Sequence, residues 1–312
     1  MRIGIVVDSA CDLPPDWLAA HGIKLLPVTV RIGQSEFVDL RDESATLDFI
    51  DNHVTGRHTA ETAAFPPEQI KALFLEQLVI DYDYVFCLTV TRQRSQIHDN
   101  ATNASFAILN EYKPIRVQAG HSTPFALRIV DSQQVFAGQG ILPVEAVRLR
   151  DAGASAPDIR SRLEFLAERS YAYMVPRDLG YLRARIKHRG DRSVSLLAAL
   201  VGGALDIKPV LHCHRGDTGP VGKVRGFEPA AEKLFAFAAE RVRAGLLTPT
   251  LCLSYGGELD QMRALPGYAA LVAACEEHHV ERFETVMSLT GMVNVGAGSL
   301  TLGFAAPPHA FA

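Results

Sequence analysis

The chain has 312 residues, of which 48% are hydrophobic and 21% are charged. This composition is typical of an ordered globular protein long enough for two hydrophobic cores, and it excludes extended disorder. The formal net charge of −4 provides no general attraction to nucleic acid or to an anionic membrane surface.

Strands and helices alternate along the first half of the sequence. Apolar, β-branched segments predict strands at 3–7, 23–32, 84–90 and 127–131. Helices are predicted at 12–21 and 98–111, and a third one opens at Pro66-Pro67 with apolar residues at helical spacing, namely Ile70, Leu73, Phe74 and Leu78. This alternation predicts a Rossmann-like α/β/α domain with a parallel sheet.

The second half begins after a helix that ends in small residues at 152–157, where we place a domain boundary. The predicted domains are 1–154 and 155–312. Strands of the second domain are predicted at 171–175, 207–213, 250–255, 283–288 and 299–304. Its helices are predicted to begin near Arg177, Ser193, Pro229 and Asp260. This order favours an α+β domain with a mixed or antiparallel sheet.

Two strands of the first domain run directly into an Asp-Ser pair, Asp8-Ser9 and Asp131-Ser132. We read both as buried strands. The carboxyl ends of parallel strands meet at one edge of a sheet, and open α/β sheets bind ligands at that edge. We therefore expect the site there. We interpret Asp8 and Asp131 mainly as carboxylates that fix loops by accepting backbone N–H bonds.

An enzymatic alternative places an active site at the same edge of the sheet, the polar rim formed by Asp8, Ser9 and Asp131. A small-molecule hydrolase or transferase built on Asp8, Ser9 and Asp131 would explain the polar strand ends. Against it, the sequence has no G-x-S-x-G nucleophile turn, no phosphate-binding P-loop and no G-x-G-x-x-G after the first strand. We therefore predict no catalytic residues and no cofactor.

Three further segments carry hydroxyls or glycines where a ligand is often bound. Thr62 precedes a predicted helix and is either an anion ligand or a turn residue. Ser95 also precedes a helix and is either a ligand or an N-cap. Residues 291–299 predict a glycine-rich turn that permits close approach of backbone to a ligand.

The cysteines and histidines do not form a familiar metal site. Cys11, Cys87, Cys213, Cys252 and Cys275 are widely spaced, which is typical of reduced, packed thiols. His212-Cys213-His214 lacks a zinc-type spacing, and strand alternation would turn Cys213 away from both histidines. Cys275 with His278-His279 lacks such a spacing as well. We predict no metal.

The N-terminal sequence lacks the basic and apolar stretches of a signal peptide. The best apolar run, from Leu196 to Leu205, is shorter than the roughly 20 residues that span a bilayer. We therefore expect a cytoplasmic protein that does not insert into membranes.

Taken in order, several motifs resemble those of the DegV family of bacterial fatty acid-binding proteins. Residues 8–14 resemble the family's D-S-T-x-D-L-P, 62–67 fall at its T-S-Q-P-S, and 91–101 fall at its S-S-x-L-S-G-T-Y-Q-S-A. Asp131-Ser132 with 138–140 matches D-S…G-Q-G. Residues 207–211 and 222–225 resemble I-K-P-I-L…G…K-V-R, and 294–298 fall at H-x-G-P-G. The similarity covers essentially the whole chain.

The resemblance implies a lipid carrier without its own catalytic site. A long-chain fatty acid would lie in an apolar tunnel, with its carboxylate held by Thr62, Ser95 and the residue at 294. That residue is Asn294, where the family has histidine, so it donates through an amide but carries no charge. The bound acid would be presented to a separate fatty acid kinase, with Arg225 facing that partner.

Several apolar residues of the second half are candidates for the tunnel wall. Packing in an ordinary core explains them equally well. They are Leu196, Leu197, Leu200, Val201 and Leu205.

Overall fold

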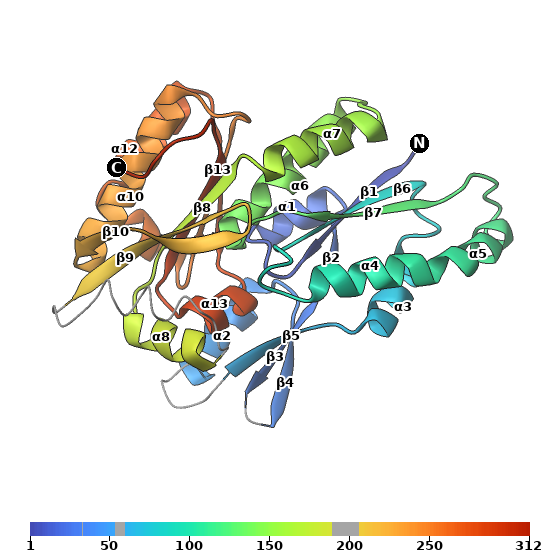
Figure 1. Ribbon diagram of the computed structural model, residues 1–312, viewed down its shortest axis with the longest axis horizontal. Coiled ribbons are helices and arrows are strands. Elements are labelled where there is room, and N and C mark those ends of the chain that lie inside the picture. The colour runs from blue at the N-terminus through green and yellow to red at the C-terminus, as the bar shows by residue number, and fades with distance from the viewer. Residues whose placement is uncertain (33, 54–59, 189–205) are drawn as a thin grey trace.

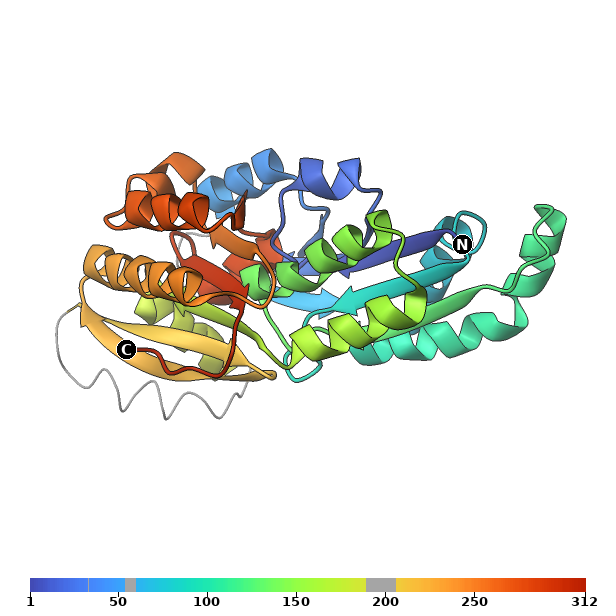
Figure 2. The same cartoon turned by 90° about the horizontal axis from the view of Figure 1, so that it is seen from above.

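The computed structural model describes residues 1–32, 34–53, 60–188 and 206–312. Within these ranges the chain forms a parallel sheet, a small antiparallel sheet and a mixed sheet. The parallel and mixed sheets lie side by side along the longest axis of the molecule, and the small sheet projects below them in the view of Figure 1. The N-terminus belongs to the parallel sheet, and the C-terminus lies against the mixed sheet (Figures 1 and 2).

The parallel sheet has the strand order β2-β1-β6-β7, formed by β2 (Lys24–Leu26), β1 (Ile3–Asp8), β6 (Tyr84–Thr89) and β7 (Ala126–Asp131). All of its pairings are parallel, as predicted. β7 is an edge strand with exposed side chains at Ala126 and Arg128, so our reading of it as a fully buried strand was wrong.

Helices cover both faces of the parallel sheet, as a Rossmann-like domain requires. One face packs on α3 (Pro67–Gln77) and α4 (Ile97–Ala107) through Val6, Val85 and Cys87. The opposite face packs on α1 (Pro15–Ala20), α6 (Ile141–Asp151) and α7 (Ala156–Ala167) through Ile5, Val7 and Leu88. The 3-10 turn η1 (Ile108–Asn110) and helix α5 (Tyr112–Gln118) follow α4, and sequence analysis did not predict α5 or α7.

The strand predicted at 23–32 is in fact two strands in two different sheets. Pro27 separates β2 from β3 (Val28–Ile32), since proline has no N–H to donate and ends the pairing with β1. β3 instead forms the antiparallel order β4-β3-β5 with β4 (Ser35–Asp39) and β5 (Ala60–Ala64). Helix α2 (Glu43–His53) follows β4.

The mixed sheet has the order β10-β9-β8-β13-β11-β12. Its strands are β8 (Ser170–Val175), β9 (Ile207–His214), β10 (Asp217–Arg225), β11 (Thr250–Tyr255), β12 (Glu281–Val286) and β13 (Leu300–Ala305). Only β11 and β12 pair in parallel, so the predicted mixed α+β domain is confirmed.

Helices of the second half flank the mixed sheet. They are α8 (Leu179–His188), α10 (Phe227–Ala244), α11 (Leu259–Arg263), α12 (Tyr268–Glu277) and α13 (Leu289–Val295). α10 and α12 pack on one side in the largest apolar core, and α8 and α13 lie toward the small sheet (Figure 1). The helix expected from Ser193 and the candidate wall residues at 196–205 lie outside the described residues.

The two larger sheets meet at the 3-10 segment η2 (Phe136–Gly140). A Cβ atom built on Gly303 of β13 would lie 2.4 Å from Cα of Gly138, so only glycine allows this approach. One cluster of buried residues contains Val7, Leu142 and Cys252 together. The domain boundary at 154 therefore stays a prediction, because the apolar core is continuous across it.

Arg41 links the two halves through a buried polar network. Its guanidinium donates to the carbonyl of Leu13 at 3.1 Å and to that of Val286 at 3.3 Å, and it pairs with Asp12 at 3.5 Å. Asp12 in turn accepts from the backbone N–H of Ser288 at 3.0 Å. Burial raises the pKa of Asp12, and the charge of Arg41 opposes that rise.

Two absences can be stated for the described part of the chain. None of its helices combines the length and the hydropathy needed to cross a membrane. Nor do three or more His, Cys, Asp or Glu side chains gather there as a metal site would require.

Candidate functional site

A cavity of about 620 Å³ lies where the three sheets meet. The loops after β1, β6 and β7 contribute Ala10, Val90 and Phe136, so the cavity adjoins the carboxyl edge that sequence analysis predicted. Its volume is in the range of about 300–1,000 Å³ that is usual for small-molecule sites. The other apolar side chains that line it include Val28, Ala64, Met174, Leu182, Ile186, Leu211 and Val295.

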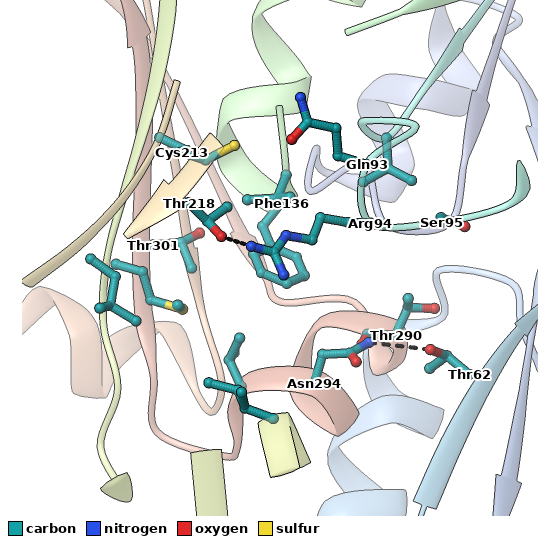
Figure 3. A pocket seen from close by; sticks show the side chains of 18 of the residues that line it. Thr62, Gln93, Arg94, Ser95, Phe136, Cys213, Thr218, Thr290, Asn294 and Thr301 are labelled. Carbon is teal, nitrogen blue, oxygen red and sulfur yellow. Dashed lines mark hydrogen bonds between the residues drawn. The ribbon is translucent and has the colours of Figure 1, made fainter. Parts of the chain in front are cut away.

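Thr62 and Asn294 meet in this cavity. Nδ2 of Asn294 donates to Oγ1 of Thr62 across 3.4 Å (Figure 3). Thr62 lies on strand β5, so our expectation of a turn before a helix was wrong, and its backbone pairs with Val30. Asn294 lies on helix α13 and not in the glycine-rich turn expected at 291–299.

The partners of Asn294 fix the orientation of its amide. Nδ2 donates to the carbonyl of Thr290 at 2.7 Å, and Oδ1 accepts from Nη2 of Arg185 at 3.4 Å. A carbonyl only accepts and a guanidinium only donates, so both contacts require the same assignment of oxygen and nitrogen. The amide N–H group is therefore directed toward Thr62.

Helix α13 is held in place by Asp39 at the end of β4. Oδ2 of Asp39 accepts from both the backbone N–H and the hydroxyl of Thr290, at 2.8 and 2.7 Å. The hydroxyl of Ser9 donates to the carbonyl of Asp39 at 2.6 Å. The position of Asn294 thus depends on the first strand of the parallel sheet, through buried contacts with ideal lengths.

Ser95 lines the same cavity from the loop between β6 and α4. Its Oγ accepts from the backbone N–H of Ile97 at 3.2 Å, which closes a turn just before α4. The N-cap position belongs to Gln96, so the interpretation of Ser95 as an N-cap was wrong. That bond uses only an oxygen lone pair, and the hydroxyl proton of Ser95 is left to donate to a ligand. The role of Ser95 as a ligand residue stays a prediction.

Arg185 of α8 is a buried cation that sequence analysis did not identify. It lines the cavity with 8% of its surface exposed. Nη1 donates to the carbonyl of Ala60, Nη2 donates to Asn294, and Nε is buried with no partner. Burial lowers the pKa of this guanidinium, while Tyr181 and Glu61 act in the opposite direction.

Arg94 is the second arginine with a guanidinium inside the cavity. It extends from the loop after β6 and donates to Oγ1 of Thr218 on β10, beside Phe136 (Figure 3). The contact joins the parallel-sheet half to the mixed-sheet half. Arg92 and Asp99 also belong to the lining, but both are exposed and pair with each other at 3.4 Å.

The Asp-Ser pairs have the loop-fixing role expected for them. Asp8 accepts from the backbone N–H of Ala10 at 3.0 Å and of Val90 at 2.5 Å. Asp131 accepts from that of Gln133 at 2.8 Å. Burial raises the pKa of Asp8 to about 6 against the effect of these hydrogen bonds. Ser9 is fully buried, and its hydroxyl donates to the carbonyl of Asp39 and accepts from the backbone N–H of Val28.

The remaining candidates lie apart or have another role. Arg225 is exposed at the end of β10 and does not line the cavity. Cys213 does line it, but burial raises the pKa of its thiol to about 12, which disfavours the thiolate that a metal would need.

Sequence analysis missed Arg185, Arg94 and Thr290. The one local signal for Arg185 is its spacing from Leu182 and Ile186, which places a cation on the apolar face of a helix. Arg94 lies in the loop that the family motif assigns to Ser95, but nothing marked its own side chain as a cavity residue, and no signal was found near Thr290. The partners of all three are distant in sequence, and only the fold brings them together.

Comparison with known proteins identifies relatives over the whole chain. One protein-family model, described as "Uncharacterised protein, DegV family", matches residues 2–306. A DegV domain-containing protein of Xanthomonas axonopodis pv. citri is 64% identical over 312 residues, which cover 100% of this chain and 99% of that protein.

Solved structures share the fold at lower identity. A stearic acid-binding protein from Eubacterium ventriosum superposes with a TM-score of 0.77 at 20% identity, covering 97% of this chain and 98% of its own. A DegV family protein from Thermus thermophilus, described for its fatty acid binding, has a TM-score of 0.76 at 22% identity, with 98% and 100% coverage.

Proposed function

The chain belongs to the DegV family, and on that basis we propose that it binds one long-chain fatty acid in the cavity between its sheets. Thr62, Ser95 and Asn294 hold the carboxylate, and the apolar walls hold the acyl chain. The observation that carries the proposal is that three polar side chains from β5, the β6–α4 loop and α13 line one largely apolar cavity. Relatives of the same fold are described as fatty acid-binding proteins.

The hydrogen-bonding capacity of the three residues suits an anion. A carboxylate has only acceptor atoms, so it needs donors. The hydroxyls of Thr62 and Ser95 each accept one bond in the structure and keep a proton to donate. The amide of Asn294 is directed toward Thr62, and its 3.4 Å bond there is long enough to be exchanged for a ligand oxygen.

The free energies expected for burying the acyl chain and for hydrogen bonding the head group differ in size. Burial of a chain of about 16 carbons contributes on the order of 12 kcal/mol at about 0.8 kcal/mol per CH₂, before ordering costs. Each hydrogen bond to a charged head group contributes about 1.5–3 kcal/mol. Affinity therefore comes mainly from the acyl chain, and the polar residues set its direction and register.

We further propose that the protein carries the acid and does not convert it. The buried, fully engaged Ser9 supports this, because the hydrolase alternative needs an accessible nucleophile. A separate cytoplasmic fatty acid kinase would receive the acid, and Arg225, exposed at the end of β10, would face it. Loss of kinase stimulation in Arg225→Ala, with lipid binding intact, would support this role.

Native mass spectrometry of the protein purified from a bacterial host tests the binding proposal. We expect a co-purified fatty acid, and less of it in the double variant Thr62→Ala, Ser95→Ala. Ser105→Ala serves as a matched control, because Ser105 lies on α4 outside the cavity and its hydroxyl donates to Thr102. Delipidated protein that takes up no hexadecanoic acid would refute the proposal.

A further inference from the structure

We propose that Arg185 makes this site selective for an ionised acid over a neutral lipid of the same length. The inference rests on the proposed function, because it assigns a role toward the head group of the same ligand. It starts from the fact that Thr62, Ser95 and Asn294 are all uncharged. A carboxylate held by them alone would keep its full negative charge inside the protein.

The buried charge of Arg185 is incompletely compensated. Its two terminal nitrogens donate to neutral oxygens, those of Ala60 and Asn294, and Nε has no partner. Within the described residues no carboxylate forms an ion pair with it, and Glu61 is exposed on β5. Glu61 therefore acts on the charge of Arg185 only without a direct ion pair. A buried guanidinium that lacks a direct ion pair is unfavourable, and an anion in the adjoining cavity relieves that cost.

Arg185 also determines which way the amide of Asn294 points. By donating to Oδ1 it keeps Nδ2 directed at Thr62, where the head group is proposed to bind. One side chain thus separates the guanidinium from Thr62. At this short range and low dielectric, the attraction for a carboxylate is far larger than in water. An alcohol of equal chain length gains hydrogen bonds there but no charge neutralisation.

Arg94 also brings a guanidinium into the cavity, but it contacts a different part of the wall. Its guanidinium donates to Thr218 on the mixed sheet (Figure 3), while that of Arg185 donates to Asn294 on α13. Arg183 lies on the same helix as Arg185 but does not line the cavity. Arg183→Gln therefore makes the same charge change on the same helix without touching the site.

The experiment compares the dissociation constants of hexadecanoic acid and 1-hexadecanol for delipidated full-length protein at pH 7.5. Wild type is expected to prefer the acid. In Arg185→Gln the acid-to-alcohol preference should fall by about tenfold or more. Arg185→Lys keeps the charge and should retain most of the preference, and Arg183→Gln should retain all of it.

The possible outcomes separate the two proposals. If wild type binds neither lipid, the proposed function fails and this inference fails with it. If wild type binds the acid but shows no preference over the alcohol, only the inference fails, and this holds even where Arg185→Gln does not fold. Equal loss of acid and alcohol binding in Arg185→Gln indicates a purely structural role and would also overturn it.

Discussion

The side-chain nitrogen of Asn294 lies 3.4 Å from the hydroxyl oxygen of Thr62, although 232 positions separate the two residues along the chain. The contact joins α13 of the mixed-sheet half to β5 of the small sheet. A site that combines these two residues exists only in the folded molecule. Its geometry is set by Asp39, which holds α13 through Thr290.

Replacement of the Thr62 hydroxyl should weaken binding of the acid specifically. Thr62→Val keeps the shape and removes the donor, so we expect the dissociation constant of hexadecanoic acid to rise by about 10- to 100-fold. Displacement of a fluorescent fatty acid measures this. Thr102→Val on α4 is the matched control, because its hydroxyl bonds to His98 outside the cavity. Equal affinities of the two variants for hexadecanoic acid would show that Thr62 does not contact the head group.

A methyl group on Gly303 should destabilise the protein strongly. The added carbon would lie 2.4 Å from Cα of Gly138, and backbone atoms cannot move aside as a side chain can. We expect Gly303→Ala to lower the free energy of unfolding by roughly 3 kcal/mol or more. Urea denaturation measures the change. Gly219→Ala is the control, since a Cβ there meets nothing within 4 Å.

Breaking the buried pair of Arg41 and Asp12 should also be costly. Arg41→Met leaves the carboxylate of Asp12 buried without its cation, for which we expect a loss of about 3–5 kcal/mol. Arg31→Met removes the exposed pair with Glu36 and should cost less than about 1 kcal/mol. The free energies of unfolding of both variants, compared with wild type, test this. Similar losses in the two would contradict the assigned role.

Asp8 should make the stability of the protein depend on pH between about 4 and 6. Its pKa is about 6 in the folded state against an ordinary value of 3.8 for an aspartate, so the folded state binds the proton more tightly. The free energy of unfolding should therefore fall as pH rises through this window, by roughly 3 kcal/mol from this group. In Asp8→Asn this pH-dependent part of the free energy of unfolding should vanish, whether the variant is more or less stable than wild type. Parallel pH profiles for the variant and wild type would show that Asp8 does not titrate there.

The sequence was sufficient for elements whose signal is local. The run at 84–90 is apolar and β-branched, and it forms β6 within one residue of the expected end. The spacing of Ile70, Phe74 and Leu78 likewise predicted α3. Both segments contribute to the same apolar core on one face of the parallel sheet. The local pattern and the tertiary packing therefore favour the same secondary structure.

Elements were missed where the tertiary environment overrides a weak pattern. Residues 60–64 read as a loop because alanine and glutamate are poor strand formers, yet pairing with β3 makes them β5. Residues 289–295 contain a glycine and two β-branched valines, and they form α13 because Ser288 caps the helix by accepting from Gly291. Of the candidate site residues, Thr62, Ser95 and Asn294 were proposed from the family motifs, and Arg185 was found only from the fold.

The placement of Arg41 bears on how a fatty acid would enter and leave the proposed site. Only 3% of this side chain is exposed, and it bonds to the carbonyls of Leu13 and Val286, on opposite halves of the molecule. A hinge motion that separates the two halves would break the bonds of this buried charged group to both carbonyls and its ion pair with Asp12 at the same time. Lengthwise sliding of the acyl chain, with the halves still docked, avoids that penalty and is the less demanding route for exchange.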